Sequence, residues 1–375
     1  MHRGHFNVTS IVNRDKENVL AVLVHMPDTP LANQGSPTYL SSGGWDWMPY
    51  VPGLNSGITD KVFLTNTGTA TLIDPWIRTN LPTRARADLS VALDVKNNSV
   101  EKTKVLVRGT ITPGNIVFQK ELDVNAHTTE QVKFDKRYFP QLCIDQPRLW
   151  WPNGYGEQYL YDASLSLISS GKDTLDVKKM RIGIRELEYE LSAYEDNSPI
   201  VRLNYNPTAA LQDGKPAFDT VKRKKTDNKV RYTNYDGEFV PYLLKPVSSQ
   251  GIELIKDSLM KEYMVIKVNG QRIFCKGGNW GMDDGMKRVS RERLEPALKL
   301  HKNMNYNMIR NWTGESTEEV FYELCDEYGM LVMNDFWLST DGFNLNPLDN
   351  CLFVRNVTET VRRFRNHPSI ALWCA

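Results

Sequence analysis

The residues with the clearest chemical potential in this sequence are tryptophans that stand beside amide, guanidinium and carboxylate side chains in its last hundred residues. An indole ring can cover the C–H face of a pyranose, while polar neighbours bind the sugar hydroxyls. A single tryptophan more often packs in a core, so the prediction of a sugar-binding surface rests on the recurrence of this mixture. The candidates in this region are Asn279, Trp280, Asp283, Arg310, Trp312, Asp335, Trp337 and Trp373.

Three aspartates, Asp283, Asp284 and Asp335, belong to the same region. Two carboxylates can act as acid and nucleophile on a glycosidic bond. Nothing in this spacing makes a reactive pair, so we expect Asp283 and Asp284 to shape a loop or to bind hydroxyls. His367 precedes Pro368, and the conformational restriction before proline favours a structural turn over a catalytic base.

Alternating strands and helices must bring these candidates together. Strands are predicted at 272–275, 308–310, 331–333 and 370–374, the first ending at 277–280. Ser316 and Glu319 have the spacing of a capping box, and Gly329 predicts the end of its helix. The apolar faces of three intervening helices are Leu294, Ala297, Leu298 and His301, then Val320, Phe321, Leu324, Cys325 and Tyr328, then Val354, Val357, Val361 and Phe364.

Four strands alternating with three helices indicate a parallel sheet. The sheet can be open and doubly wound, or part of an eight-stranded barrel. The glycine-rich turn of a nucleotide-binding sheet is absent, which favours the barrel. In a barrel the carboxyl ends of the strands share one rim, where the candidate residues would meet.

Up to about residue 275 the sequence has the pattern of short strands. Residues 18–24 form a β-rich run, and 88–96 and 159–167 alternate between apolar and polar residues. Turn sequences separate these runs, as in antiparallel sandwiches. Residues 190–262 are polar and rich in Lys and Asp, and their weak periodicity predicts a connection or insertion.

Composition excludes some partners. The 375 residues suffice for two or three domains, and a formal net charge of +1 offers no basic field for nucleic acid or an anionic membrane. No apolar run approaches the roughly 20 residues of a membrane helix, and the first residues lack the apolar core of a signal peptide. The five cysteines are scattered, which predicts isolated buried thiols and no metal site.

Several motifs resemble those of family 2 glycoside hydrolases, which include β-galactosidases, β-glucuronidases, β-mannosidases, exo-β-glucosaminidases and plant-type endo-β-mannosidases. The run Arg365-Asn366-His367-Pro368-Ser369-Ile370-Ala371-Leu372-Trp373 resembles the fourth barrel strand of the family. Residues 274–280 are similar to its first barrel strand, 305–310 with 322–329 to its second unit, 149–156 to its immunoglobulin-like domain, and 44–47 to a sandwich loop of the mannosidase and glucosaminidase branch. The similarity covers most of the chain except about 190–262.

The resemblance implies a multidomain protein of β and α/β class. Residues 1–75 would be the C-terminal part of a jelly-roll sugar-binding domain, and 76–185 an immunoglobulin-like β-sandwich. Residues 186–269 would be a connection or insertion, and 270–375 the N-terminal half of a (β/α)8 TIM barrel.

The resemblance also implies a retaining mechanism, in which one glutamate protonates the leaving oxygen and a second attacks the anomeric carbon. Both glutamates are expected beyond Ala375, so no catalytic residue is assigned and the chain alone is predicted to be inactive. Neither metal nor organic cofactor is implied. Family members are often periplasmic, extracellular or lysosomal. Residues that match substrate-pocket positions are Asp46, Asn279, Trp280, Arg310, Trp312 and Trp337, and Trp45 adjoins the first of them.

One motif departs from the family. Its branch usually has glycines after the second-strand tryptophan, whereas this chain has Trp312-Thr313-Gly314-Glu315. The sugar therefore stays open among β-linked mannoside, glucosaminide and galactoside. Two other interpretations also stay open: a non-catalytic carbohydrate-binding protein, and the product of a decayed or mis-predicted gene that does not fold stably.

Overall fold

The chain forms two compact units in a computed structural model. The structure describes residues 4, 6–24, 58, 61–195, 200–225, 239–256, 264–281, 289–314, 316–337 and 349–374. One unit contains Thr69–Trp151 and Tyr155–Cys275, and the other contains Met1–Gly68, Pro152–Gly154 and Lys276–Ala375.

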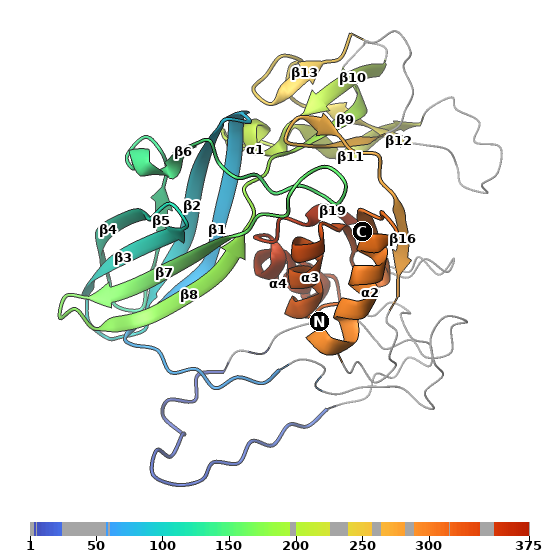
Figure 1. The fold of residues 1–375 in the computed structure, drawn as a ribbon. Helices are drawn as coiled ribbons and strands as arrows, with labels where there is room; N and C mark the ends of the chain where they lie inside the picture. The colour runs from blue at the N-terminus through green and yellow to red at the C-terminus, as the bar shows by residue number, and fades with distance from the viewer. Residues whose placement is uncertain are drawn as a thin grey trace, which may run out of the picture. The chain divides into compact units, whose positions relative to one another are not determined.

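Eight strands of the first unit form a sandwich of two antiparallel sheets (Figure 1). In β2 the predicted alternation is confirmed, because Leu89, Val91, Leu93 and Val95 are all at most 2% exposed. Successive residues of a strand point to opposite faces, so these four side chains fill the space between the sheets. One sheet consists of β1 (Ala70–Thr83), β2 (Arg86–Asn97), β5 (Thr129–Phe134) and β6 (Cys143–Asp145), and the other of β3 (Thr103–Thr112), β4 (Ile116–Val124), β7 (Tyr161–Ser169) and β8 (Thr174–Ile182).

The segment interpreted as a connection or insertion contributes to a seven-stranded sheet. One face of this sheet is apolar, with Ala193, Leu203 and Ile252 buried. The other face carries ion pairs such as Glu190 with Arg272, whose Oε1 and Nε lie 2.7 Å apart. Charged residues on this face contribute to the polar composition of the segment. The strands are β9 (Leu187–Tyr194), β10 (Ile200–Tyr205), β11 (Phe218–Lys225), β12 (Phe239–Leu243), β13 (Ile252–Leu254), β14 (Val265–Val268) and β15 (Gln271–Arg272), with one short helix, α1 (Pro207–Ala210).

The second unit contains the predicted parallel βα array. Its strands pair in chain order, β16-β17-β18-β19, without the reversal of order that a doubly wound sheet shows. The second, third and fourth predicted strands and all three helices are confirmed. The elements are β16 (Gly277–Trp280), α2 (Arg291–Asn303), β17 (Met308–Asn311), the 3-10 turn η2 (Trp312–Gly314), α3 (Glu319–Tyr328), β18 (Leu331–Asp335), α4 (Asn350–Phe364) and β19 (Ile370–Cys374).

The first parallel strand was predicted too early in the chain. Gln271 and Arg272 pair backward with β14, and the glycine-containing run 277–280 is itself the strand. A Cβ atom on Gly277 would overlap with the carbonyl oxygen of Met308. The glycine therefore permits close approach of β17 instead of marking a turn.

The predicted capping box and one helix face also differ. Helix α3 begins at Glu319 with Glu318 as its N-cap and has no side-chain cap. The Ser316 hydroxyl accepts from Trp280 Nε1 instead of capping the helix. Val354 was predicted on the apolar face of α4, but it is 61% exposed. Gly329 ends α3 in the left-handed conformation, φ 73°, as expected.

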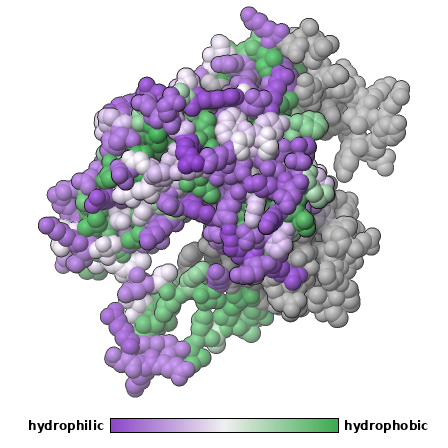
Figure 2. Space-filling view, viewed as in Figure 1, coloured by the Kyte–Doolittle hydropathy of each residue, from purple (hydrophilic) through white to green (hydrophobic). Residues whose placement is uncertain are grey.

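The β-rich run at 18–24 is not a strand. Val19 is 88% exposed and Leu23 is 81% exposed, and Figure 2 shows apolar side chains gathered on this extended segment. A strand exists only through hydrogen bonds to a neighbour, and none of the described strands pairs with this run. The jelly-roll assignment of 1–75 stays a prediction.

The cysteine prediction holds in part. All five cysteines are free, and Cys325 is buried, but Cys275 and Cys351 are exposed. Within the described ranges, no three His, Cys, Asp or Glu residues are grouped as a metal would require. No helix in the described part of the chain has the length and apolar character to span a membrane.

Candidate sugar-binding site

Two rows of side chains cross the parallel sheet near the carboxyl ends of its strands. Ile309, Val332 and Ile370 pack with residues of α2, α3 and α4, so this side of the sheet faces the helices. Each next residue along a strand points to the opposite face. In β19 a register shift opposite Val332 and Met333 adds one residue, so Ile370 lies opposite Val332 and Leu372 lies opposite Met333. The row facing away from the helices is Asn279, Arg310, Met333 and Leu372, and the following helix-facing row is Trp280, Asn311, Asn334 and Trp373.

The side facing away from the helices carries an ion pair between Arg310 and Asp335. Arg310 Nε lies 3.1 and 3.0 Å from the two carboxylate oxygens, and Nη2 lies 2.7 Å from Oδ2. The Asp335 side chain is 6% exposed, whereas that of Arg310 is 31% exposed. A guanidinium has five N–H donors in a planar fork, so the pair satisfies the buried carboxylate and leaves donors for other acceptors. Asn279, exposed beside Arg310, adds an amide to the same row.

Trp280 and Trp373 lie on the other side of the sheet, which corrects their predicted place in one ring of site residues. The Trp280 ring is centred 5.5 Å from Phe321, and its Nε1 donates to Ser316 Oγ at 3.0 Å. Trp373 stacks on Phe336 at 5.6 Å with an interplanar angle of 1°. Because each follows an away-facing residue by one position, the pleat turns both indoles toward the helix layer.

Trp312 and Trp337 follow their strands and are buried, 7% and 2% exposed. Gly314, with φ 64°, fits against the Asp335 carbonyl so closely that a Cβ atom would overlap with it, and that Cβ would lie 3.3 Å from Trp337 Nε1. Both indoles are therefore largely covered by the protein in this structure. The structure brings together Asn279, Arg310 and Asp335, while Trp45, Asp46, Asp283 and Asp284 lie outside the described residues.

His367 is structural, as predicted. Its Nδ1 lies 2.6 Å from Asp326 Oδ2, and Nε2 lies 3.7 Å from Glu319 Oε2. Burial alone would lower the pKa of His367, but the two carboxylates outweigh burial and raise this pKa to about 9. The ring is an imidazolium at neutral pH and cannot accept a proton as a base.

Sequence reasoning missed a polar network behind the sheet, made by Asn311, Asn334, Tyr322 and Ser316. A signal was present, because an asparagine stands at the same level of two neighbouring strands. Side chains at such positions become neighbours only once the strand register is known.

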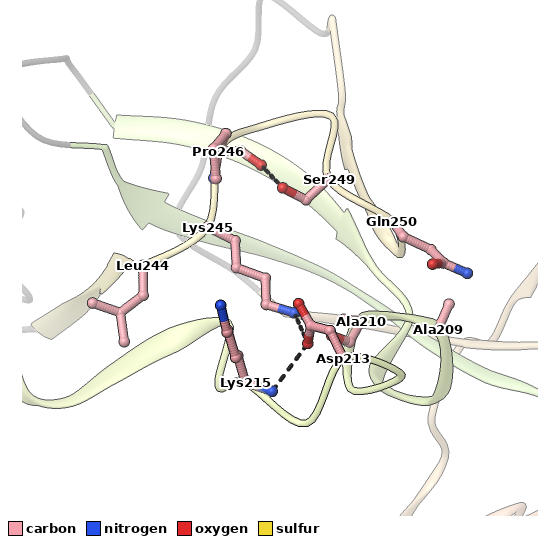
Figure 3. A pocket seen from close by; sticks show the side chains of 9 residues that line it. All are labelled: Ala209, Ala210, Asp213, Lys215, Leu244, Lys245, Pro246, Ser249 and Gln250. Carbon is pink, nitrogen blue, oxygen red and sulfur yellow. Dashed lines mark hydrogen bonds and ion pairs between the residues drawn. The ribbon is translucent and has the colours of Figure 1, made fainter.

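A separate cavity of about 300 Å3 lies in the other unit, near α1 (Figure 3). Lys245 Nζ there donates to Asp213 Oδ1 at 2.8 Å and to the carbonyl of Ala210. The hydrogen bond from Lys245 lowers the pKa of Asp213. This lysine ties down the end of α1, and no predicted site residue lines the cavity.

Comparison with known proteins shows the family. Residues 70–185 match the model of glycosyl hydrolases family 2, and residues 259–375 match the TIM barrel domain of the same family. The chain belongs to glycosyl hydrolases family 2. This family 2 chain is 28% identical to a mannosylglycoprotein endo-β-mannosidase of Lilium longiflorum, over 100% of the chain and 35% of the relative. It is 26% identical to an exo-β-D-glucosaminidase of Streptomyces avermitilis, over 98% of the chain and 33% of the relative.

Solved family 2 structures agree with this assignment. A β-D-mannosidase from Dictyoglomus thermophilum matches with a TM-score of 0.53 and 25% identity, over 82% of this chain and 29% of that one. An exo-chitosanase of Amycolatopsis orientalis matches with a TM-score of 0.56 and 20% identity, over 82% of this chain and 28% of that one. This match shows the shared fold. The family 2 chain thus spans about a third of the length of the curated relatives.

Proposed function

We propose that these residues form the sugar-binding part of a glycosidase that hydrolyses β-linked mannosides, glucosaminides or galactosides with retention of configuration. Family membership supports this reaction class, and the mannosidase and glucosaminidase relatives support mannosides and glucosaminides among these sugars. The observation that carries the proposal is the Arg310–Asp335 ion pair on the face away from the helices, with exposed Asn279 beside it.

The pair suits recognition better than bond cleavage. Its guanidinium offers directed donors to sugar hydroxyls, and Asn279 offers both a donor and an acceptor. Asp335 is held through both oxygens by Arg310, so it fixes Arg310 instead of attacking the sugar. In a retaining enzyme two carboxyl groups about 5–5.5 Å apart perform the chemistry, and by resemblance to the family we place both beyond Ala375.

The domain division expected from the sequence is part of the proposal. Four parallel strands paired in chain order support the first half of a (β/α)8 barrel within 270–375. The double sheet of β1 to β8 supports an immunoglobulin-like domain at 76–185. The jelly-roll remnant at 1–75 rests on family resemblance.

The test is an assay of the purified chain against nitrophenyl β-mannoside, β-glucosaminide and β-galactoside, with titration calorimetry of the corresponding free sugars. We expect binding without turnover, since removing both carboxylates removes the mechanism. Turnover above the blank would contradict the placement of the glutamates. If a longer protein that includes both glutamates bound sugar but did not cleave it, the non-catalytic binding protein would be the better reading.

A further inference from the structure

A pair of buried amides connects β17 and β18 on the side that faces the helices. Asn311 and Asn334 are at the same level of the two strands and are 0% and 1% exposed. Asn311 Nδ2 donates to Asn334 Oδ1 at 2.8 Å, and the hydroxyl of Tyr322 donates to the same oxygen at 2.6 Å. Buried amides cost free energy unless they are hydrogen-bonded, and these bonds offset that cost.

Each amide also binds backbone at the carboxyl end of the sheet. Asn311 Oδ1 accepts the N–H of Ser316 at 3.0 Å, and its Nδ2 donates to the Ser316 carbonyl at 2.7 Å. Asn334 Nδ2 donates to the carbonyl of Asp335 at 3.0 Å. Asn311 therefore closes the loop after β17, and Asn334 fixes the last peptide of β18.

The Asp335 carbonyl is in contact with both Asn334 and the loop after β17. It accepts from Asn334, and Gly314 of the loop after β17 packs directly against it. The same residue holds Arg310 through its side chain. A shift of this peptide would therefore move the carboxylate that orients Arg310.

We propose that Asn334 is a positioning residue for the Arg310–Asp335 ion pair. It lies on the opposite face from Arg310 and acts through the Asp335 peptide. The Nδ2 donor carries this role, because the Oδ1 acceptor serves Asn311 and Tyr322 instead. The effect on sugar affinity rests on the proposed function, whereas the effect on the ion pair does not.

The experiment compares Asn334→Asp with Tyr322→Phe in the full chain. The first change removes the donor to Asp335 and keeps an acceptor, whereas the second removes a different bond to the same amide and leaves that donor in place. Arginine labelled with 15N reports solvent exchange of the Arg310 Nε–H, assigned by its loss in Arg310→Lys. We expect exchange to accelerate roughly tenfold in Asn334→Asp and less than twofold in Tyr322→Phe, since one hydrogen bond changes an equilibrium by about that factor. Sugar affinity should fall roughly three- to tenfold in the first variant alone.

Asn334→Ser replaces Asn334→Asp if the buried carboxylate prevents folding, because serine removes the Nδ2 donor without adding charge. Wild-type exchange of the Arg310 Nε–H in either folded Asn334 variant would overturn the proposal. Equal acceleration in Tyr322→Phe would also overturn it, since the network would then act only by general stability. If the wild-type chain binds no sugar, the proposed function fails, but the exchange measurement still decides the positioning role.

Discussion

Asn279 and Trp280 are consecutive in one strand, yet their side chains lie on opposite faces of the parallel sheet. Asn279 is exposed beside Arg310, whereas Trp280 packs 5.5 Å from Phe321 and donates to Ser316. The pleat of β16 separates the side chain that we propose to bind sugar from one that packs against the helices. The two neighbours should respond to truncation in different ways.

Trp280→Ala should destabilise the βα unit by roughly 2–4 kcal/mol, because it removes an indole from the helix layer and leaves a cavity. Asn279→Ala should change stability by no more than about 0.5 kcal/mol, but it should weaken sugar binding. Urea unfolding and calorimetry measure the two effects. Equal stability of the two variants would contradict the assignment of Trp280 to packing.

Arg310→Ala should cost about 3–5 kcal/mol of stability, because it leaves the nearly buried Asp335 carboxylate without its charged partner. Arg355→Ala is the matched control. It breaks an exposed pair with Glu359 four residues later in α4 and should cost about 0.5 kcal/mol or less. Chemical denaturation of both variants measures the difference. Similar losses of stability in the two variants would show that the Arg310–Asp335 ion pair contributes no more than an exposed pair.

Gly314→Ala should lower stability by roughly 2–4 kcal/mol and weaken sugar binding, since its Cβ atom would displace the Asp335 carbonyl as well as strain the left-handed backbone. Gly154→Ala controls for backbone strain alone, because Gly154 has φ 83° and no atom near the added Cβ. It should cost about 1 kcal/mol. Thermal unfolding compares them, and a smaller loss at Gly314 would argue against the close contact.

The His367 imidazolium should make stability depend on pH. Its pKa is raised to about 9 in the folded chain by Asp326 and Glu319, which outweigh burial. A raised folded-state pKa gives stability that is complete below the unfolded value of about 6.5 and is lost as pH rises toward 9. We expect a loss on the order of 3 kcal/mol over this window.

Urea unfolding at pH values between 6 and 9.5 tests this dependence. His367→Gln is the comparison, since glutamine cannot titrate. If the wild type and His367→Gln follow parallel curves above pH 6.5, the ion pair with Asp326 contributes no pH-dependent stability.

Local patterns determined much of this protein. The spacing of Leu294 and Leu298 predicted α2, the alternation of Leu89 to Val95 predicted a sandwich strand, and the strand ends predicted Arg310, Asp335 and Asn279 as neighbours. These features follow from periods of 3.6 and 2 residues and from parallel strand order, all of which are visible along the chain. The motifs that resemble family 2 glycoside hydrolases predicted the same strands and helices.

Tertiary structure decided which face each candidate occupies. Trp280 and Asn279 are indistinguishable as rim residues until the register of β16 against β17 is fixed, because a shift of one residue exchanges the two faces. Likewise, the charges of Glu188 and Lys267 indicated a polar connection until their pairing on neighbouring strands showed a folded sheet. Asn311 and Asn334 lie 23 residues apart in the sequence and meet only because adjacent parallel strands bring equal levels together.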